Sequence, residues 1–374
     1  MSAPFSFCDL ATTGVQGLRP YEPGKPLSEL ERDYGVRDAI KLASNENPLG
    51  PSPAAQEAAR GALGDIARYP DGNGFELKRA IATRFGVEIT GITLGNGSND
   101  VLEIIARAFL APGVTSVFSQ HAFAVYPIVT QAIGAMARVV PAHTGERGQR
   151  YGHDLDAMAA AVNDKTRVVF IANPNNPTGT WLRKDELEAF LVRMPKTVIV
   201  VLDEAYVEYV TEADYPDSIP WLLRFPNLII TRTFSKAYGL AGLRVGFALS
   251  HPQVADVLNR VRQPFNVNIL AMTAATAALG DRAHLEASLK LNQAGLAQWV
   301  EATAEMGLSF IPSVGNFICL DVGRAAAPVY ELLLREGVIV RPVANYGLPN
   351  HLRITLGLAQ ENRRAISALR KVLA

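Results

Sequence analysis

The sequence has 374 residues, of which 48% are hydrophobic and 19% are charged. This balance supplies enough apolar material for a sizeable core and excludes wholesale disorder, and the length predicts two or three domains. The 36 Lys and Arg residues balance the 36 Asp and Glu residues, so no overall positive field would attract nucleic acid or an anionic membrane. Individual arginines can still converge on a local anion.

The cysteines and histidines exclude several kinds of site. Cys8 and Cys319 lie far apart and lack metal-ligand spacing, so we expect neither a disulfide scaffold nor a zinc ribbon. None of the six histidines forms an H-x-x-x-H pair, and we expect no metal. The first residues lack the basic start and apolar core of a signal peptide. The long uncharged stretch 263–280 is broken by asparagines and threonines, which favours a cytoplasmic protein without a membrane span.

The first 35 residues mix Pro, Gly and charge, which predicts an extended arm leading into a short helix. From there to residue 262, short apolar runs alternate with helical patterns such as residues 99–110. Apolar runs without polar alternation predict strands that are buried on both faces, as in a parallel sheet. These runs cover residues 114–119, 167–172, 197–202, 228–232 and 245–249.

The pattern changes after residue 262. The stretch 263–280 predicts a linking segment and a buried helix of small residues, and a long helix follows Arg282. Short strands then alternate with helices, which predicts a smaller α+β domain. We therefore expect an α/β protein with an N-terminal arm and small-domain segment (1–35), a large domain (36–262) and a small C-terminal domain (263–374). The late strands are expected at residues 316–321, 338–341 and 351–355.

The most informative motif is the segment TRTFSKAYG, residues 231–239. It places Lys236 directly after an expected buried strand. A loop lysine usually lies on the surface, but here the hydroxyls of Thr233 and Ser235 and the guanidinium of Arg244 would together form a cradle for an anion. A nearby cation also lowers the pKa of a lysine, which favours the free amine that a Schiff base requires.

Two further motifs follow expected strands. Residues 173–179 (NPNNPTG) are by themselves typical of a turn. Asp203, in VIVVLDEAY, stands at the carboxyl end of a buried run, where open α/β sheets bind ligands. It could also be a helix cap or a Walker-B-like acid. The chain has no G-x-x-x-x-G-K-[ST] and no G-x-G-x-x-G, so neither a P-loop nor a Rossmann dinucleotide site is supported.

A glycine-rich turn opens the helix expected at residues 99–110. The sequence GNGSND, residues 95–100, would present free backbone N–H groups to a phosphate. An ordinary N-cap explains Ser98 or Asn99 equally well when either is taken singly.

Together and in this order, these motifs closely resemble the fold-type I pyridoxal-phosphate enzymes of the aspartate-aminotransferase superfamily, over almost the whole chain. Within that superfamily the chain most resembles the histidinol-phosphate aminotransferases. The segments that carry this narrower resemblance are LRPY (18–21), KLASNENP (41–48), RYPD (68–71) and LRITLG (352–357). The resemblance implies pyridoxal 5'-phosphate as cofactor, a mostly parallel central sheet between helices, and a homodimer with shared active sites.

The resemblance also implies roles for single residues. Lys236 would carry the cofactor and move a proton, and Asp203 would pair with the pyridine nitrogen and keep the ring an electron acceptor. Asn176 and Tyr206 would bond the phenolate oxygen, and Phe123 would stack on the ring. The phosphate would be held by Ser98, Asn99, Thr233, Ser235, Arg244 and Tyr69, the last reaching across from the neighbouring subunit.

Substrate binding is assigned to Arg353, which matches the family's arginine that binds a substrate carboxylate through its planar guanidinium group. Glutamate carries an α-carboxylate, whereas histidinol phosphate carries a phosphate ester and no carboxylate. One pocket must therefore accept both anions, and we expect Arg341, Tyr21 and Asn47 to assist. Arg341 could instead be a solvated charge at a strand end.

The implied reaction is a ping-pong transfer of an amino group between histidinol phosphate and 2-oxoglutarate, giving imidazole-acetol phosphate and glutamate in histidine biosynthesis. The shared motifs do not separate this activity from that of an aromatic or broad-specificity aminotransferase, or from threonine-phosphate decarboxylation. A binding protein that had lost the chemistry would lack the lysine or the acid, and both Lys236 and Asp203 are present.

Overall fold

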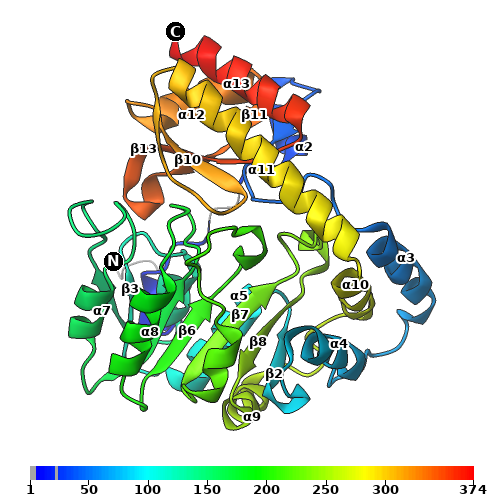
Figure 1. The fold of residues 1–374 in the computed structure, drawn as a ribbon, viewed down its shortest axis with the longest axis vertical. Coiled ribbons are helices and arrows are strands. Elements are labelled where there is room, and N and C mark those ends of the chain that lie inside the picture. Colours follow the sequence, from blue (N-terminus) through cyan, green and yellow to red (C-terminus); the bar gives the residue numbers. More distant parts are fainter. Residues whose placement is uncertain (1–5, 22–23) are drawn as a thin grey trace.

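The computed structural model describes residues 6–21 and 24–374. Its larger part is a seven-stranded sheet between helices, in the lower half of Figure 1, with strand order β2-β8-β7-β6-β5-β3-β4. The strands are β2 (Ile92–Gly95), β3 (Thr115–Ser119), β4 (Met136–Val140), β5 (Thr166–Ala172), β6 (Ile199–Asp203), β7 (Leu228–Thr233) and β8 (Gly246–Ser250).

The sheet is mostly parallel, as predicted. Strands β7, β6, β5, β3 and β4 pair in parallel, and β8 runs antiparallel to both of its neighbours. Of the five strands expected from apolar runs, β8 is therefore the exception. Strands β2 and β4 were not predicted: β2 has only four residues, and β4 is exposed along most of the sheet edge, so neither forms a distinctive apolar run.

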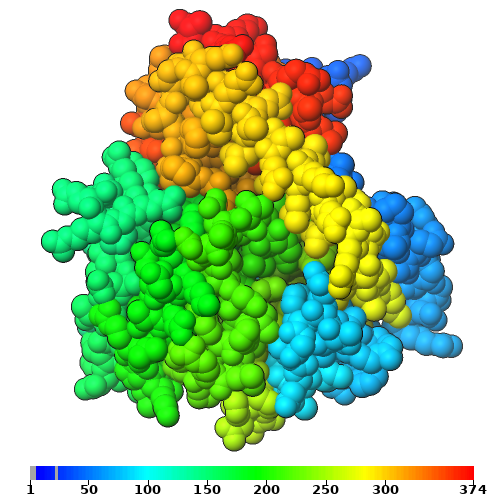
Figure 2. All heavy atoms as spheres, viewed as in Figure 1, coloured from blue at the N-terminus to red at the C-terminus, as the bar shows by residue number. Residues whose placement is uncertain are grey.

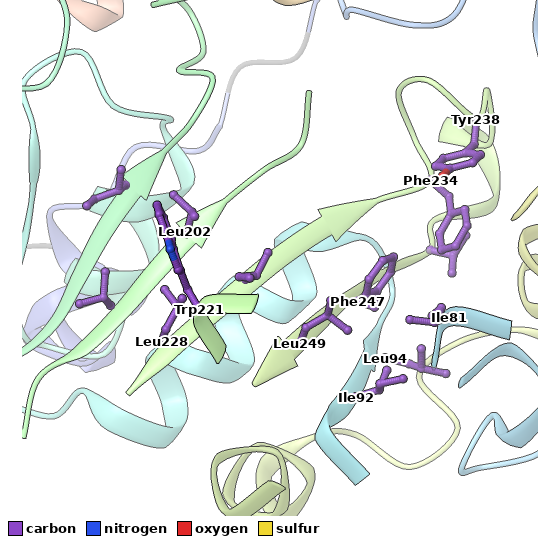
Figure 3. Close-up of a cluster of buried hydrophobic side chains, with 14 of the residues drawn as sticks. Ile81, Ile92, Leu94, Leu202, Trp221, Leu228, Phe234, Tyr238, Phe247 and Leu249 are labelled. Atoms are coloured by element: carbon purple, nitrogen blue, oxygen red, sulfur yellow. The ribbon is translucent and has the colours of Figure 1, made fainter. Parts of the chain in front are cut away.

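Alternate residues of the central strands face opposite helix layers, because side chains alternate along a strand. On β5, Phe170 packs in the core beneath α5, α6 and α9, whereas Val169 and Ile171 pack in the core on the other face. Figure 3 shows part of this second core, where Phe247 of β8 lies beside Ile81. The covering helices are α5 (Ser98–Phe109), α6 (Val125–Ala132) and α9 (Pro252–Val261) on one face, and α3 (Pro53–Ala62), α4 (Phe75–Phe85), α7 (Leu155–Ala161), α8 (Lys184–Arg193) and α10 (Ile269–Gly280) on the other.

The smaller part is built on a four-stranded antiparallel sheet of order β12-β13-β10-β9. Its core is closed by residues of α11, α12 and α13. In Figure 1 α12 and α13 lie at the top with the upper part of α11, which runs down toward α10. Strand β1 (Ile40–Lys41) pairs in parallel with β11 beside it. The remaining elements are α1 (Thr13–Gln16), α2 (Leu27–Tyr34), α11 (Arg282–Glu305), α12 (Ala326–Arg335), α13 (Ala359–Leu373), β9 (Ser309–Ile311), β10 (Phe317–Asp321), β11 (Val338–Ile339), β12 (Arg341–Val343) and β13 (Leu348–Thr355).

The helix of small residues expected before residue 280 is α10, and it packs against α3 and α4 in the core of the larger part. Helix α11 then crosses from α10 to the smaller part, and Figure 2 shows it as a continuous ridge on the surface. The division at residue 263 stays a prediction. We propose that the boundary falls instead at the start of α11, because the residues before it belong to the core of the larger part.

Candidate active site

A pocket lies where the carboxyl ends of β5, β6 and β7 meet β12 and β13 of the smaller part. Parallel strands bring their carboxyl ends to one edge of the sheet, so the motifs that follow them converge there. The predicted site residues that line this pocket are Tyr21, Ser98, Asn99, Phe123, Asn176, Asp203, Tyr206, Thr233, Ser235, Lys236, Arg244, Arg341 and Arg353.

Lys236 presents a partly buried amine to this pocket. Its Nζ donates a hydrogen bond to the backbone oxygen of Ser44 at 2.9 Å. Withdrawal from solvent lowers the pKa of the Lys236 amine to about 7, and the positive charges of Arg353 and Arg244 act in the same direction. The sequence predicted the contribution of Arg244, and the structure adds the larger one of Arg353. A substantial share of the amine is therefore uncharged near neutral pH.

Asp203 is a buried acid at the end of β6, and it is held by two hydroxyl groups. Tyr126 donates to its Oδ2 at 2.8 Å and Thr231 donates to its Oδ1 at 3.0 Å. Burial raises the pKa of Asp203 to about 6, and the two hydroxyl groups oppose that rise by stabilising the ionised form. The sequence analysis missed Tyr126, which lies in the first turn of α6, three residues after Phe123.

An anion cradle lies at the start of α5. Ser98 and Asn99, in its first turn, line the pocket that Arg244 also lines. The N–H groups of a first helical turn have no partner within the helix and are suited to an anion. Gly97 precedes the helix with φ of 87°, and a Cβ at this position would come within 2.5 Å of the Arg244 guanidinium. Arg244 Nη1 in turn donates to Ser235 Oγ at 3.3 Å. Glycine at position 97 thus lets a cation approach the helix start.

Two arginines lie side by side on neighbouring strands of the smaller sheet. Arg341 on β12 and Arg353 on β13 are directly opposite partners in the antiparallel register, and each is less than 10% exposed. Guanidinium groups bind carboxylates and phosphates, so two of them on neighbouring strands suit an anion. Arg353 donates to Asn176 Oδ1 and, at 2.7 Å, to the backbone oxygen of Ala43. A solvated strand end does not describe Arg341, because its side chain is buried and lines the pocket.

Tyr206 lies beside these groups and is 3% exposed. Its hydroxyl oxygen accepts a hydrogen bond from Asn45 Nδ2 at 2.9 Å. Phe123 lines the same pocket and packs edge-on against Tyr126, with ring centroids 5.9 Å apart. Asn45 is a pocket residue that the sequence analysis missed, although it stands in the segment KLASNENP.

Two predicted site residues lie outside the pocket. Asn47 was expected to contact substrate, but its amide donates to the backbone oxygen of Ala237 and to Ser288 Oγ, which makes it a buried structural contact. The side chain that enters the pocket from this segment is that of Asn45. Tyr69 is 83% exposed and stacks on Phe265, with centroids 4.8 Å apart. It therefore does not reach the phosphate cradle of its own chain.

The residues present fit the cofactor that the resemblance implies. Backbone N–H groups and Arg244 suit a phosphate, Phe123 offers an aromatic face, and Asp203 offers an acid to a ring nitrogen. Lys236 supplies an amine that is partly uncharged at neutral pH. Within residues 6–21 and 24–374 there is no cluster of three His, Cys, Asp or Glu side chains arranged to hold a metal ion, and none of the helices combines the length and apolar character needed to cross a membrane.

Comparisons with known proteins agree over nearly the full length. The family model for aminotransferase class I and II matches residues 37–369. "Histidinol-phosphate aminotransferase 2" of Pseudomonas fluorescens is 62% identical over 98% of both chains. "Histidinol-phosphate aminotransferase 1" of Nitrosococcus oceani is 59% identical over 98% of both. The crystal structure of histidinol-phosphate aminotransferase from Sinorhizobium meliloti, in complex with pyridoxal-5'-phosphate, superposes with a TM-score of 0.89 at 31% identity and 97% coverage of both chains.

Proposed function

We propose that the chain, which belongs to the class I and II aminotransferases, transfers the amino group of histidinol phosphate to 2-oxoglutarate. The products are imidazole-acetol phosphate and glutamate, in histidine biosynthesis. The observation that carries the choice of substrate is the pair Arg341 and Arg353, opposed across β12 and β13 in one pocket with Lys236. The printed names of the relatives at 62% and 59% identity support the same choice.

Pyridoxal 5'-phosphate is the proposed cofactor. When bound, it supplies a ring that accepts electrons from the carbon next to the substrate nitrogen. The α5 start, Thr233, Ser235 and Arg244 would hold its phosphate. Asp203 would hold the proton on the ring nitrogen, while Asn176 and Tyr206 would donate to the phenolate oxygen.

The chain's own residues would then position and protonate the substrate. Lys236 Nζ would carry the cofactor in the resting enzyme. Once freed, the same amine would take the proton from the substrate's α-carbon, and in the reverse direction it would return that proton to the same carbon. Arg353 and Arg341 would bind either the carboxylate of glutamate or the phosphate ester of histidinol phosphate, since guanidinium groups accept both anions. Tyr21 lies over Arg341, with 5.6 Å between the guanidinium carbon and the ring centroid, and would cover that subsite.

We further propose a cytoplasmic homodimer with shared active sites. Tyr69 and Phe265 form an exposed aromatic pair, 83% and 45% exposed, of the kind that a subunit interface covers. From such an interface Tyr69 would reach the phosphate cradle of the neighbouring subunit. The two free cysteines, Cys8 and Cys319, suit a reducing compartment.

The lowered pKa of Lys236 predicts how fast the cofactor-free enzyme captures pyridoxal phosphate at different pH values. The amine is protonated and unreactive below its pKa of about 7, so the capture rate should rise with pH and be half-maximal near 7. With an exposed lysine, the capture rate would be half-maximal only at about pH 10. The measurement is the initial absorbance change between about pH 5.5 and 9. Phosphate-free pyridoxal serves as the control for titration of the cofactor's own phosphate, and a rate still rising steeply at the upper limit would contradict the lowered pKa.

A single-turnover titration tests the substrate. Enzyme loaded with pyridoxal phosphate is mixed with histidinol phosphate, phenylalanine or tyrosine, each without a keto acid. The visible absorption should fade as the amino group moves to the cofactor, and histidinol phosphate should achieve this at far lower concentration because its phosphate meets two arginines.

If the aromatic amino acids perform as well, the chain is an aromatic or broad-specificity aminotransferase. Release of carbon dioxide from threonine phosphate would indicate the decarboxylase alternative. Loaded enzyme that none of these compounds bleaches would overturn the proposed function.

A further inference from the structure

Asn45 holds an unusual backbone conformation in the wall of the pocket. Its φ of 56° lies in the left-handed region, which residues other than glycine rarely adopt and which asparagine tolerates better than most. The two residues before it give their backbone oxygens to the reactive groups: Ala43 to Arg353 and Ser44 to Lys236. Such a conformation persists only where its surroundings hold it in place.

Asn45 is 1% exposed and is held in place by four hydrogen bonds. Its backbone N–H donates to Thr355 Oγ1 at 2.9 Å, and its backbone oxygen accepts from Asn316 Nδ2 at 3.0 Å. The Thr355 hydroxyl donates its own proton to Asn45 Oδ1 at 3.2 Å. This contact fixes the orientation of the amide, so that its NH₂ group faces the Tyr206 hydroxyl at 2.9 Å.

That contact decides what Tyr206 can do. A phenol has one proton, and its oxygen here accepts a hydrogen bond from Asn45, so the proton remains available to a group in the pocket. A hydroxyl that accepts one hydrogen bond also donates the next more strongly. Burial raises the pKa of Tyr206 to about 12, while the charge of Arg353 and the bond from Asn45 oppose that rise and strengthen the phenol as a donor.

The same contacts connect Tyr206 to β13, the strand that carries the proposed substrate-binding residue Arg353. Thr355 and Arg353 are two residues apart on β13 and therefore point to the same face of the strand. We propose that Asn45 is a positioning residue that aims the proton of Tyr206 into the pocket and links it to β13, thereby setting the proton affinity of the bound cofactor. The inference rests on the proposed function, in which Tyr206 donates to the phenolate oxygen of pyridoxal phosphate.

The test is a spectrophotometric pH titration of the enzyme loaded with pyridoxal phosphate. Asn45→Gly permits the left-handed backbone and removes the amide. A weaker donor to the phenolate favours the protonated chromophore, so the pKa of the chromophore should rise, with a roughly tenfold loss of acidity. Thr355→Val should also raise the pKa of the chromophore, because the Asn45 amide loses the hydrogen bond that orients it. Thr355→Ser keeps the hydroxyl and should leave this pKa near the wild-type value.

A double-mutant cycle separates positioning from a general structural effect. Tyr206→Phe should raise the pKa of the chromophore by itself, and Asn45→Gly should then add almost nothing, because the group it positions is gone. An Asn45→Gly shift that persists undiminished in the Tyr206→Phe background would overturn the inference. So would an unchanged pKa in the single Asn45→Gly variant.

The outcomes also distinguish this inference from the proposed function. If the wild-type chain forms no visible complex with pyridoxal phosphate, or if Tyr206→Phe leaves the chromophore's pKa unchanged, the proposed role of the pocket fails and the inference fails with it. If Tyr206→Phe raises the pKa and Asn45→Gly does not, only the role of Asn45 is wrong. Thermal unfolding of each loaded variant checks that the fold persists.

Discussion

Replacing Lys236 with alanine should abolish amino transfer, with a loss of at least about 10⁴-fold in turnover. The structure places the Lys236 amine in the pocket that Asp203 and Arg353 line. Burial and, to a smaller extent, two cations lower its pKa to about 7. In the proposed reaction this amine both carries the cofactor and moves the proton at the substrate's α-carbon. Steady-state turnover with histidinol phosphate and 2-oxoglutarate measures the loss.

The fold should survive this change. Withdrawing an amine from solvent costs free energy, so its removal should not lower the temperature of thermal unfolding in the cofactor-free state. Lys184, an exposed lysine at the start of α8, provides the matched control, and Lys184→Ala should leave turnover unchanged. A Lys236→Ala variant with turnover within tenfold of the wild type would show that another group does the chemistry.

The comparisons confirm the predicted family and fold. The prediction succeeded because it depended on residues that are adjacent in sequence to buried strands. Asp203 and Lys236 each stand next to a buried apolar strand, and neighbouring parallel strands must bring their carboxyl ends together. Sequence order and strand burial were therefore enough to predict that these residues share one edge of the sheet. Strand β4 shows the converse, because an exposed edge strand lacks the apolar run on which the prediction depended.

Contacts between distant segments could not be predicted in this way. Asn45 bonds Tyr206, Thr355 and Asn316, which lie more than 150 residues away along the chain. The same segment contains Asn47, the expected substrate contact, and residue type alone does not distinguish the two asparagines. In the structure Asn45 has a left-handed backbone and lines the pocket, whereas Asn47 bonds Ala237 and Ser288.

Arg341 illustrates a third case, in which the sequence left two interpretations open. The choice depended on the pairing of β12 with β13, which places Arg341 opposite Arg353. That register follows from how the strands of the smaller sheet pair, not from the residues flanking either arginine. The burial of Arg341 in the pocket then favours a binding role over a solvated strand end.

Arg353→Ala should weaken both half reactions. The guanidinium is 7% exposed and is held by Asn176 and the backbone oxygen of Ala43, so it offers its remaining donors to an anion in a fixed orientation. Loss of one partner from a buried, hydrogen-bonded charge pair costs about 3–4 kcal/mol, which corresponds to a 10²–10³-fold fall in kcat/KM. The fall should be similar for histidinol phosphate and for glutamate, because both bring an anion to this group.

Arg353→Lys keeps the charge and loses the fork, so it should recover part of the activity with both substrates. The exposed Arg79 on α4 is the matched control, and Arg79→Ala should leave both half reactions unchanged. The half reactions are followed separately, from the fading of the cofactor absorption with each amino donor. If only the glutamate half reaction suffered, the phosphate ester would have to bind elsewhere, and the idea that one arginine serves both anions would be wrong.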